Sequence, residues 1–299
     1  MAPSRRSSIL GITGAVVVAA LVASAVGVGG DRFAGVPAVW WCVGAAFAVN
    51  WVALVPAYVT GSERFFDLVG SLTYLATLAL ALTLSTERDL RSWAIAAMVA
   101  IWATRLGTFL TLRIRATGGD GRFDALKRDP LAFCLTWTLQ GLWVSLTMAA
   151  AWAAITSSEA NGVGSGDGTG FDVWLGIGGV IWATGIAVEV VSDEQKRRFR
   201  ANPAHDGRFI SSGLWAWSRH PNYFGEILLW SGVAIVALPT FDSWRWIALV
   251  SPVFVFILLT RISGIPLLER RARKRWGGEP AYERYVQSTP SLVPRPPRP

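Results

Sequence analysis

Residues 66–84 read FDLVGSLTYLATLALALTL, an apolar run with Asp67 as its one charged residue. A helix needs roughly 20 predominantly apolar residues to cross the hydrocarbon core of a bilayer, so this run predicts a membrane span. Of the 299 residues, 52% are hydrophobic and only 16% are charged, a composition typical of a membrane protein. We therefore expect an all-α, polytopic integral membrane helix bundle of about eight transmembrane helices. The other apolar runs lie at residues 9–28, 38–59, 92–112, 131–155, 171–191, 224–238 and 244–262.

The first apolar run has a second interpretation. Arg5 and Arg6 precede it, and Ala23-Ser24-Ala25 resembles the cleavage site of a signal peptide. Cleavage would leave seven transmembrane helices in the same topology. Because the run is about as long as a full span, we expect residues 1–30 to be retained as the first transmembrane helix.

Lys and Arg are distributed unevenly between the loops. Alternate loops carry most of them, in the ranges 113–128, 196–219 and 261–298. Positive residues in short loops stay cytoplasmic, so both termini are expected in the cytoplasm, which requires an even number of spans. The net charge of +8 is then largely topological, with anionic membrane lipids as a further attraction and no need for nucleic-acid binding. The remaining loops hold Arg32, Arg88, Arg91 and Arg245.

Two loops and the two cysteines complete this outline. The Gly- and Ser-rich stretch 157–170 predicts a flexible outer loop, and residues 117–130 predict a cytoplasmic hairpin, interpreted as a solvated connection. Cys42 and Cys134 both lie inside apolar runs. Neither a disulfide framework nor a metal site is therefore expected.

Five charged residues lie inside or at the ends of predicted spans. Such charges are costly in a membrane and are usually functional or paired. With the topology above, all five fall in the cytoplasmic half of the bilayer, which predicts a polar cavity open to the cytosol. Pairwise salt bridges that merely join helices are the alternative. The five residues are Asp67, Arg105, Glu189, Glu226 and Arg261.

A polar stripe continues from the sixth span into the cytosol. Glu189, Asp193, Arg197 and Arg200 are separated by four, four and three residues. This spacing places them on one face of a continuing helix. A positive-inside loop alone would explain the charge but would not require this register.

The motif Arg219-His220-Pro221-Asn222-Tyr223-Phe224-Gly225-Glu226 leads into the seventh span. Pro suits the first turn of a helix, whose free backbone N–H groups and dipole favour an anion. Asn222, Tyr223 and Glu226 lie within one turn and can hydrogen-bond the polar parts of a cofactor. The alternative is that Arg219, His220 and Tyr223 are interfacial anchors, and the motif by itself leaves both interpretations open.

Together these residues carry a resemblance to a known family. The order Asp193-x6-Arg200, Arg208 and then Asn222-Tyr223-Phe224-Gly225-Glu226 resembles the C-terminal cofactor-binding half of the steroid 5α-reductase family. The likeness covers residues 185–293, and it is weak in the N-terminal half. Arg219-His220-Pro221-Asn222-Tyr223, followed by Arg261, Glu269, Trp276 and Tyr282 to Tyr285, looks most like the bacterial membrane branch of that family, whose function is largely unassigned.

The resemblance implies an NADPH site at the cytoplasmic ends of the helices and an apolar lipid substrate that enters from the bilayer. Residues 31–170 would then hold the substrate pocket and residues 171–293 the cofactor, with 294–299 as a disordered tail. The implied location is a bacterial inner membrane, with the active site facing the cytoplasm. The implied cofactor contacts are Asp193, Arg197, Arg200, Arg208, His220, Asn222, Tyr223, Glu226 and Arg261.

The resemblance also implies a catalytic carboxylate at the start of an early helix. Here that position is Asp67 in place of the usual Glu, and the family's substrate-directed Tyr has no clear match in Trp102-Ala103-Thr104-Arg105. Reduction of a double bond conjugated to a carbonyl needs a donor at the carbonyl oxygen as negative charge develops. Arg105 or a protonated Asp67 can supply it.

An integral membrane methyltransferase of the isoprenylcysteine carboxyl methyltransferase type is the alternative function. It shares the Arg-His-Pro-x-Tyr-x-Gly signature and uses S-adenosylmethionine, which has no phosphates. That family tends to carry paired Glu after its last span, where this chain has Leu268-Glu269-Arg270. The Arg-rich stretch 197–208 favours the phosphate-bearing NADPH, since Arg binds phosphate bidentately.

Overall fold

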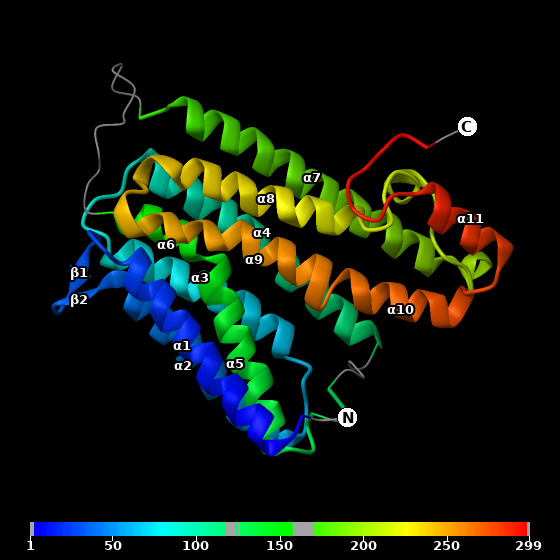
Figure 1. Cartoon of the computed structure of the whole chain (residues 1–299), viewed down its shortest axis with the longest axis horizontal. Helices are drawn as coiled ribbons and strands as arrows, with labels where there is room; N and C mark the ends of the chain where they lie inside the picture. Colours follow the sequence, from blue (N-terminus) through cyan, green and yellow to red (C-terminus); the bar gives the residue numbers. More distant parts are fainter. Residues whose placement is uncertain (1–2, 118–122, 125, 158–169, 298–299) are drawn as a thin grey trace. The chain divides into compact units, whose positions relative to one another are not determined.

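The computed structural model describes residues 3–117, 123–124, 126–157 and 170–297 (Figure 1). These residues form helices with one small hairpin, β1 (Arg32–Phe33) paired with β2 (Val36–Pro37). Short 3-10 turns, η1 (Pro203–His205), η2 (Gly213–Ala216), η3 (Leu238–Thr240) and η4 (Ser243–Leu249), and a π turn, η5 (Leu258–Ile262), join the helices. The helices are α1 (Arg5–Val26), α2 (Ala38–Thr60), α3 (Phe66–Leu84), α4 (Leu90–Thr117), α5 (Pro130–Thr147), α6 (Ala149–Ile155), α7 (Val173–Ala201), α8 (Pro221–Ala237), α9 (Val250–Ile257), α10 (Ile265–Trp276) and α11 (Pro280–Ser288).

The membrane-spanning character of the chain is confirmed. Among the described residues, seven helices are long and apolar enough to cross a bilayer, and the bent pair α5–α6 is an eighth candidate. The all-α polytopic bundle predicted from the sequence is therefore correct, whereas the cytoplasmic position of the termini stays a prediction. The predicted loop residues 118–122 and 158–169 lie outside the described residues.

The predicted span 131–155 is not straight but bends by 51° between α5 and α6. The Ser251 hydroxyl donates to the Thr147 carbonyl oxygen at 2.6 Å, and the Thr147 and Tyr74 hydroxyls are 2.5 Å apart. Side chains that hydrogen-bond a helix carbonyl from outside are an established cause of bends. Hydropathy does not register such a bend, because every residue around it is apolar or uncharged.

The chain divides into two compact units, of which unit 1 comprises residues 1–175 and 236–251. In unit 1, two arginines that the sequence placed in outer loops are buried. Arg91 pairs with Asp172 and donates to the Val236 carbonyl. Arg245 donates to the Val28 carbonyl at 2.8 Å. These contacts tie the segments between helices to the bundle and satisfy charges that would be costly if buried alone.

Unit 2 comprises residues 176–235 and 252–299, and within it α7 and α8 lie side by side (Figure 1). Glycines let their backbones approach closely. A Cβ at Gly225 would lie 2.6 Å from the Gly185 carbonyl oxygen and 2.7 Å from the Glu189 amide nitrogen. A Cβ at Gly232 would lie 2.6 Å from the Trp182 amide nitrogen. Small residues at such contacts are the usual way that membrane helices associate.

Unit 2 also continues beyond the apolar part of its helices. α7 runs ten residues past the predicted span 171–191, and the strongly basic α10 follows the last span after a break at Ser263 and Gly264. The predicted tail 294–299 is described up to Pro297, and there the Arg295 amide donates to the Trp217 carbonyl oxygen at 2.9 Å. The extensions of α7 and α10, with α11, build the surface that carries the candidate site.

The α7–α8 contact leads to a first prediction. Gly225→Ala places a methyl group against backbone atoms that cannot rotate away, so the free energy of unfolding should fall by about 1–3 kcal/mol. Gly179→Ala is the matched control on α7, since a Cβ there has nothing within 4 Å; it should leave stability unchanged or raise it by up to about 1 kcal/mol, because Ala is the better helix former. Thermal unfolding of both variants in one detergent measures this. Equal melting temperatures would contradict the close contact.

Candidate functional site: a basic, aromatic pocket in unit 2

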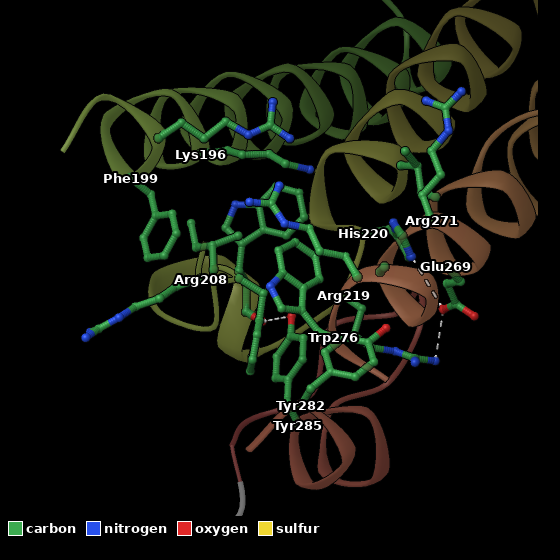
Figure 2. A pocket seen from close by; sticks show the side chains of 17 residues that line it. Lys196, Phe199, Arg208, Arg219, His220, Glu269, Arg271, Trp276, Tyr282 and Tyr285 are labelled. Carbon is green, nitrogen blue, oxygen red and sulfur yellow. Dashed lines mark hydrogen bonds and ion pairs between the residues drawn. The ribbon is translucent and has the colours of Figure 1, made fainter. Parts of the chain in front are cut away.

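Unit 2 contains a cavity of about 360 Å³ between the C-terminal end of α7, the segment before α8, α10 and α11 (Figure 2). Its volume falls at the lower end of the roughly 300–1,000 Å³ of small-molecule sites. We call it the basic pocket. Its lining consists of Lys196, Phe199, Arg200, Arg208, Phe209, Ile210, Trp215, Arg219, His220, Leu268, Glu269, Arg271, Ala272, Arg275, Trp276, Tyr282 and Tyr285.

Positive charge dominates this lining. Six of the described lining residues are cationic, and Glu269 is the one carboxylate among them. A concave site with one sign of charge concentrates ions of the opposite sign. The arrangement therefore favours an anionic ligand, with Arg offering bidentate hydrogen bonds to phosphate or carboxylate. The six cations are Lys196, Arg200, Arg208, Arg219, Arg271 and Arg275.

Aromatic rings supply the rest of the wall. The Phe209 ring lies edge-on to Tyr282 at 5.3 Å between centroids and tilted to Tyr285 at the same distance. The Lys196 ammonium lies 4.2 Å from the centre of the Trp215 ring. Aromatic faces accept flat ring systems, so the lining combines features that suit a planar group and an anionic group in one ligand.

Local hydrogen bonds hold the loop before α8 against α7. The Trp215 Nε1–H donates to the Ser192 carbonyl at 3.0 Å, and the Leu214 amide donates to Gln195 Oε1 at 2.9 Å. The Tyr285 hydroxyl donates to the Trp215 carbonyl oxygen at 2.7 Å. The 3-10 turn η2, in which Trp215 is buried, is thus held by both α7 and α11, and Arg219 and His220 follow it at the pocket.

A carboxylate organises the start of α8. Glu269 Oε1 lies 3.1 Å from Arg219 Nη2 and 3.5 Å from His220 Nε2 (Figure 2). Pro221 opens α8 as predicted, and the His220 amide donates to the Ser218 hydroxyl at 3.1 Å. The motif residues therefore meet a residue on α10 that lies far away in sequence.

Three of the predicted cofactor contacts, Arg200, Arg208 and His220, line the basic pocket. Two more meet beside it, because Asn222 Nδ2 donates to Asp193 Oδ1 at 3.3 Å. Asp193 on α7 is largely buried, so the predicted stripe does face α8 at this level.

The remaining predicted contacts are not part of the pocket lining. Tyr223 stacks on His220 with ring centroids 5.7 Å apart. Arg197 is 61% exposed and pairs with Glu194 on its own helix at 2.6 Å. Glu226 is half-buried on α8, and Arg261 is exposed in the π turn. A role for these four residues in cofactor binding stays a prediction.

The sequence interpretation missed about half of the lining. The family resemblance was the sole reason for naming Glu269, Trp276, Tyr282 and Tyr285, and it assigned them no role. Phe209 was not named. On α10 the spacing of Leu268, Arg271, Ala272 and Arg275 was an available signal, since three and four residues place them on one helix face.

In unit 1, Asp67 lies in the first turn of α3 as predicted. Its Oδ2 is 3.7 Å from Arg113 Nη2, a partner that the sequence interpretation did not consider. The guanidinium of Arg105 lies over the Phe109 ring, 5.3 Å from its centre. The joint polar pocket of Asp67 and Arg105 stays a prediction, as does the shared cavity with Glu189, Glu226 and Arg261, which belong to unit 2.

The register of α3 against α4 explains the partner of Asp67. A Cβ at Gly107 would lie 2.6 Å from the Ser71 Cβ, which fixes these two positions opposite each other. Asp67 lies one turn nearer the start of α3 than Ser71 does. Because α4 runs antiparallel to α3, the same direction along α4 leads from Gly107 to Arg113. Hydropathy placed Asp67 and Arg105 in the same half of the bilayer, whereas side-chain packing decides the register.

Burial changes the titration of two pocket residues. Burial lowers the pKa of His220 below its usual 6.5, and the neighbouring Glu269 only partly offsets this. Burial also raises the pKa of the Tyr285 hydroxyl. His220 is therefore neutral at pH 7, and Tyr285 stays protonated and can donate its hydrogen bond to Trp215.

The lowered pKa of His220 gives a pH prediction. The unfolded chain takes up this proton at a higher pH than the folded protein does, so stability is full above pH 6.5 and falls as the pH drops through the folded pKa. His220→Gln should therefore lose less in melting temperature than the parent between pH 8 and pH 5. His205→Gln, which removes the other, half-exposed histidine, is the control. Identical slopes for His220→Gln and the parent would contradict the assignment.

Comparison with known proteins places the chain in a family. A search of curated proteins found a probable O-methyltransferase, ustE of Ustilaginoidea virens, 33% identical over 64 residues. That match spans only 21% of this chain and 22% of the methyltransferase. No solved structure matches the chain. Residues 53–289 match the family model described as "Protein of unknown function (DUF1295)", which is grouped with steroid 5α-reductase-like proteins. The match covers most of the chain, so the protein belongs to the DUF1295 family.

Proposed function

We propose that the protein is a membrane-embedded, NADPH-dependent reductase of a carbon–carbon double bond conjugated to a carbonyl in an apolar lipid. The observation that carries this proposal is the basic pocket, with six cations and one carboxylate among its described lining residues. NADPH combines phosphates with two flat ring systems, which is the chemistry that this lining suits. The family match and its relation to steroid 5α-reductase-like proteins support the same reaction class.

The residues present fit such a cofactor. The Nε–H of Arg219 is buried without a hydrogen-bond partner among the described residues, and a buried donor left unsatisfied costs about 1–3 kcal/mol. A phosphate oxygen would satisfy it. Arg200, Arg208 and Arg219 would hold the phosphates, and the contacting Phe209 and Tyr282 rings would form an apolar wall beside an adenine.

When bound, NADPH supplies a hydride. The chain must then orient the lipid and stabilise the charge that develops on its carbonyl oxygen. We assign these roles to Asp67 and Arg105 in unit 1. With Arg113 beside it, Asp67 serves as an orienting carboxylate, and Arg105 donates toward the carbonyl oxygen. Apolar side chains exposed on the spans, such as Leu72 and Ile101, provide a lipid-compatible surface.

A methyltransferase that uses S-adenosylmethionine is the second candidate. The short match to a probable O-methyltransferase favours it, and Glu269 offers a carboxylate for the ammonium group of that cofactor. Its sulfonium and ammonium groups are cationic, however, and six cations in the lining oppose them. The reductase accounts for more of the pocket.

Cofactor binding tests the two candidates directly. Arg200→Ala and Asn222→Ala should each weaken NADPH binding, by about tenfold for the charged contact and about fivefold for the neutral one. Arg198→Ala is the control, because this arginine is on the same helix, is 76% exposed and is absent from the lining. Equilibrium dialysis of the purified proteins against labelled NADPH and labelled S-adenosylmethionine gives the affinities. Binding of S-adenosylmethionine alone would reverse the choice of function.

The roles of Asp67 and Arg105 predict an effect on turnover. Asp67→Asn or Arg105→Leu should lower kcat by about tenfold or more, with NADPH affinity nearly unchanged, because their contacts strengthen only in the transition state. NADPH oxidation with a panel of conjugated steroid, polyprenoid and enoyl lipids measures this. Thr108→Ala, on an exposed part of α4, is the control. Parental rates in both variants would make the pair structural and direct attention to Tyr74.

The proposed cytoplasmic site predicts the outcome of accessibility labelling. A cysteine in the β1–β2 hairpin, Val36→Cys, should react with a membrane-impermeant maleimide in intact cells. A cysteine at the exposed Asp206 should react only after permeabilisation, since the loops rich in Lys and Arg stay inside. The parent protein, with Cys42 and Cys134, sets the background. The reverse pattern would place the basic pocket outside the cell.

A further inference from the structure

The segment that follows α11, residues 289–295, lies along the residues that precede α8. We call this segment the strap. Three hydrogen bonds of 2.7–2.9 Å join it to residues 217–219. They run from the Arg219 amide to the Pro290 carbonyl, from the Ser218 hydroxyl to the Leu292 carbonyl and from the Arg295 amide to the Trp217 carbonyl.

The strap also reaches the pocket with a side chain. The Ser291 hydroxyl donates to Glu269 Oε1 at 3.2 Å. The same oxygen is the one that lies 3.1 Å from Arg219 Nη2 and 3.5 Å from His220 Nε2. One carboxylate oxygen on α10 therefore gathers groups from the strap and from the segment before α8.

Of the residues around this carboxylate oxygen, Arg219 has the features needed to bind a ligand. Its side chain is 17% exposed and lines the basic pocket. One donor is taken by Glu269, whereas the buried Nε–H has no partner among the described residues. Because a long side chain loses much rotamer freedom when it is fixed, prior fixation by Glu269 removes part of the cost of binding.

We propose that the strap is a working part of the binding site. Ser291 is a positioning residue that acts through Glu269 on Arg219, so that the Arg219 Nε–H donates a hydrogen bond to an anionic oxygen of the ligand. The inference rests on the proposed function for the identity of the ligand, NADPH, but the strap contacts require only that the ligand carries a phosphate.

The test measures the dissociation constants of the full-length protein for NADPH and, separately, for inorganic pyrophosphate. Ser291→Ala should weaken both by about fivefold, since it loses a hydrogen bond to a charged group. Ser291→Thr keeps the hydroxyl and should restore the parental values. Ser288→Ala, an exposed serine at the end of α11, is the control and should change neither.

A double-mutant comparison separates a positioning role of Ser291 from a general loss of structure. In an Arg219→Ala background, Ser291→Ala should have no further effect on either affinity, because interacting residues are non-additive. Glu269→Gln keeps the shape of the side chain and serves as a second variant if Ser291→Ala unfolds. Its affinity for pyrophosphate should fall as well, although a negative charge has left the pocket.

The outcomes distinguish this inference from the proposed function. Weaker pyrophosphate binding in Ser291→Ala, with no NADPH binding in the parent, would support the strap and overturn the reductase. Unchanged affinities for both ligands in Ser291→Ala and Glu269→Gln would overturn the strap. An equal loss in the parental and Arg219→Ala backgrounds would also overturn it, because Ser291 would then not act through Arg219.

Discussion

The close approach of α7 and α8 is the contact on which the candidate site depends. Gly185, Gly225 and Gly232 leave no room for a Cβ, so the two helix backbones meet directly. This contact fixes the register of α7 against α8. Asp193 on α7 can contact Asn222 on α8 only in that register. A larger residue at Gly225 would separate the helices and with them Asp193 from Asn222.

The basic pocket forms beyond this contact, where α7 and α10 are no longer apolar. There the helices carry many charges of the same sign, and their mutual repulsion must be offset. A cation–π contact stabilises part of that charge, where Lys196 lies over the Trp215 ring. An ion pair with Glu269 stabilises the charge of Arg219. A phosphate-bearing ligand would complete the neutralisation. The charges of the lining thus favour an anion without further rearrangement, and such preorganisation lowers the cost of binding.

Unit 1 illustrates a different use of charge. Arg91 and Arg245 are buried and bonded to carbonyl groups and to Asp172, so they join segments of unit 1. Asp67 differs, because its distance of 3.7 Å from a partly exposed Arg113 is a looser contact. The charged contacts of unit 1 therefore fall into two groups, and the looser one contains the residue proposed for catalysis.

The sequence determined the class of the protein and the position of most helices. The length and polarity of an apolar run are local properties, and they decide whether the run can span a bilayer. It also determined that Pro221 opens α8 and that Asp67 lies in the first turn of α3. Tertiary structure alone decided the bend at Thr147, the pairing of Asp67 with Arg113, and the meeting of Glu269 and Ser291 with the start of α8. Each of these depends on hydrogen bonds or side-chain packing between segments distant in sequence, and periodicity contains no information about which distant segments meet.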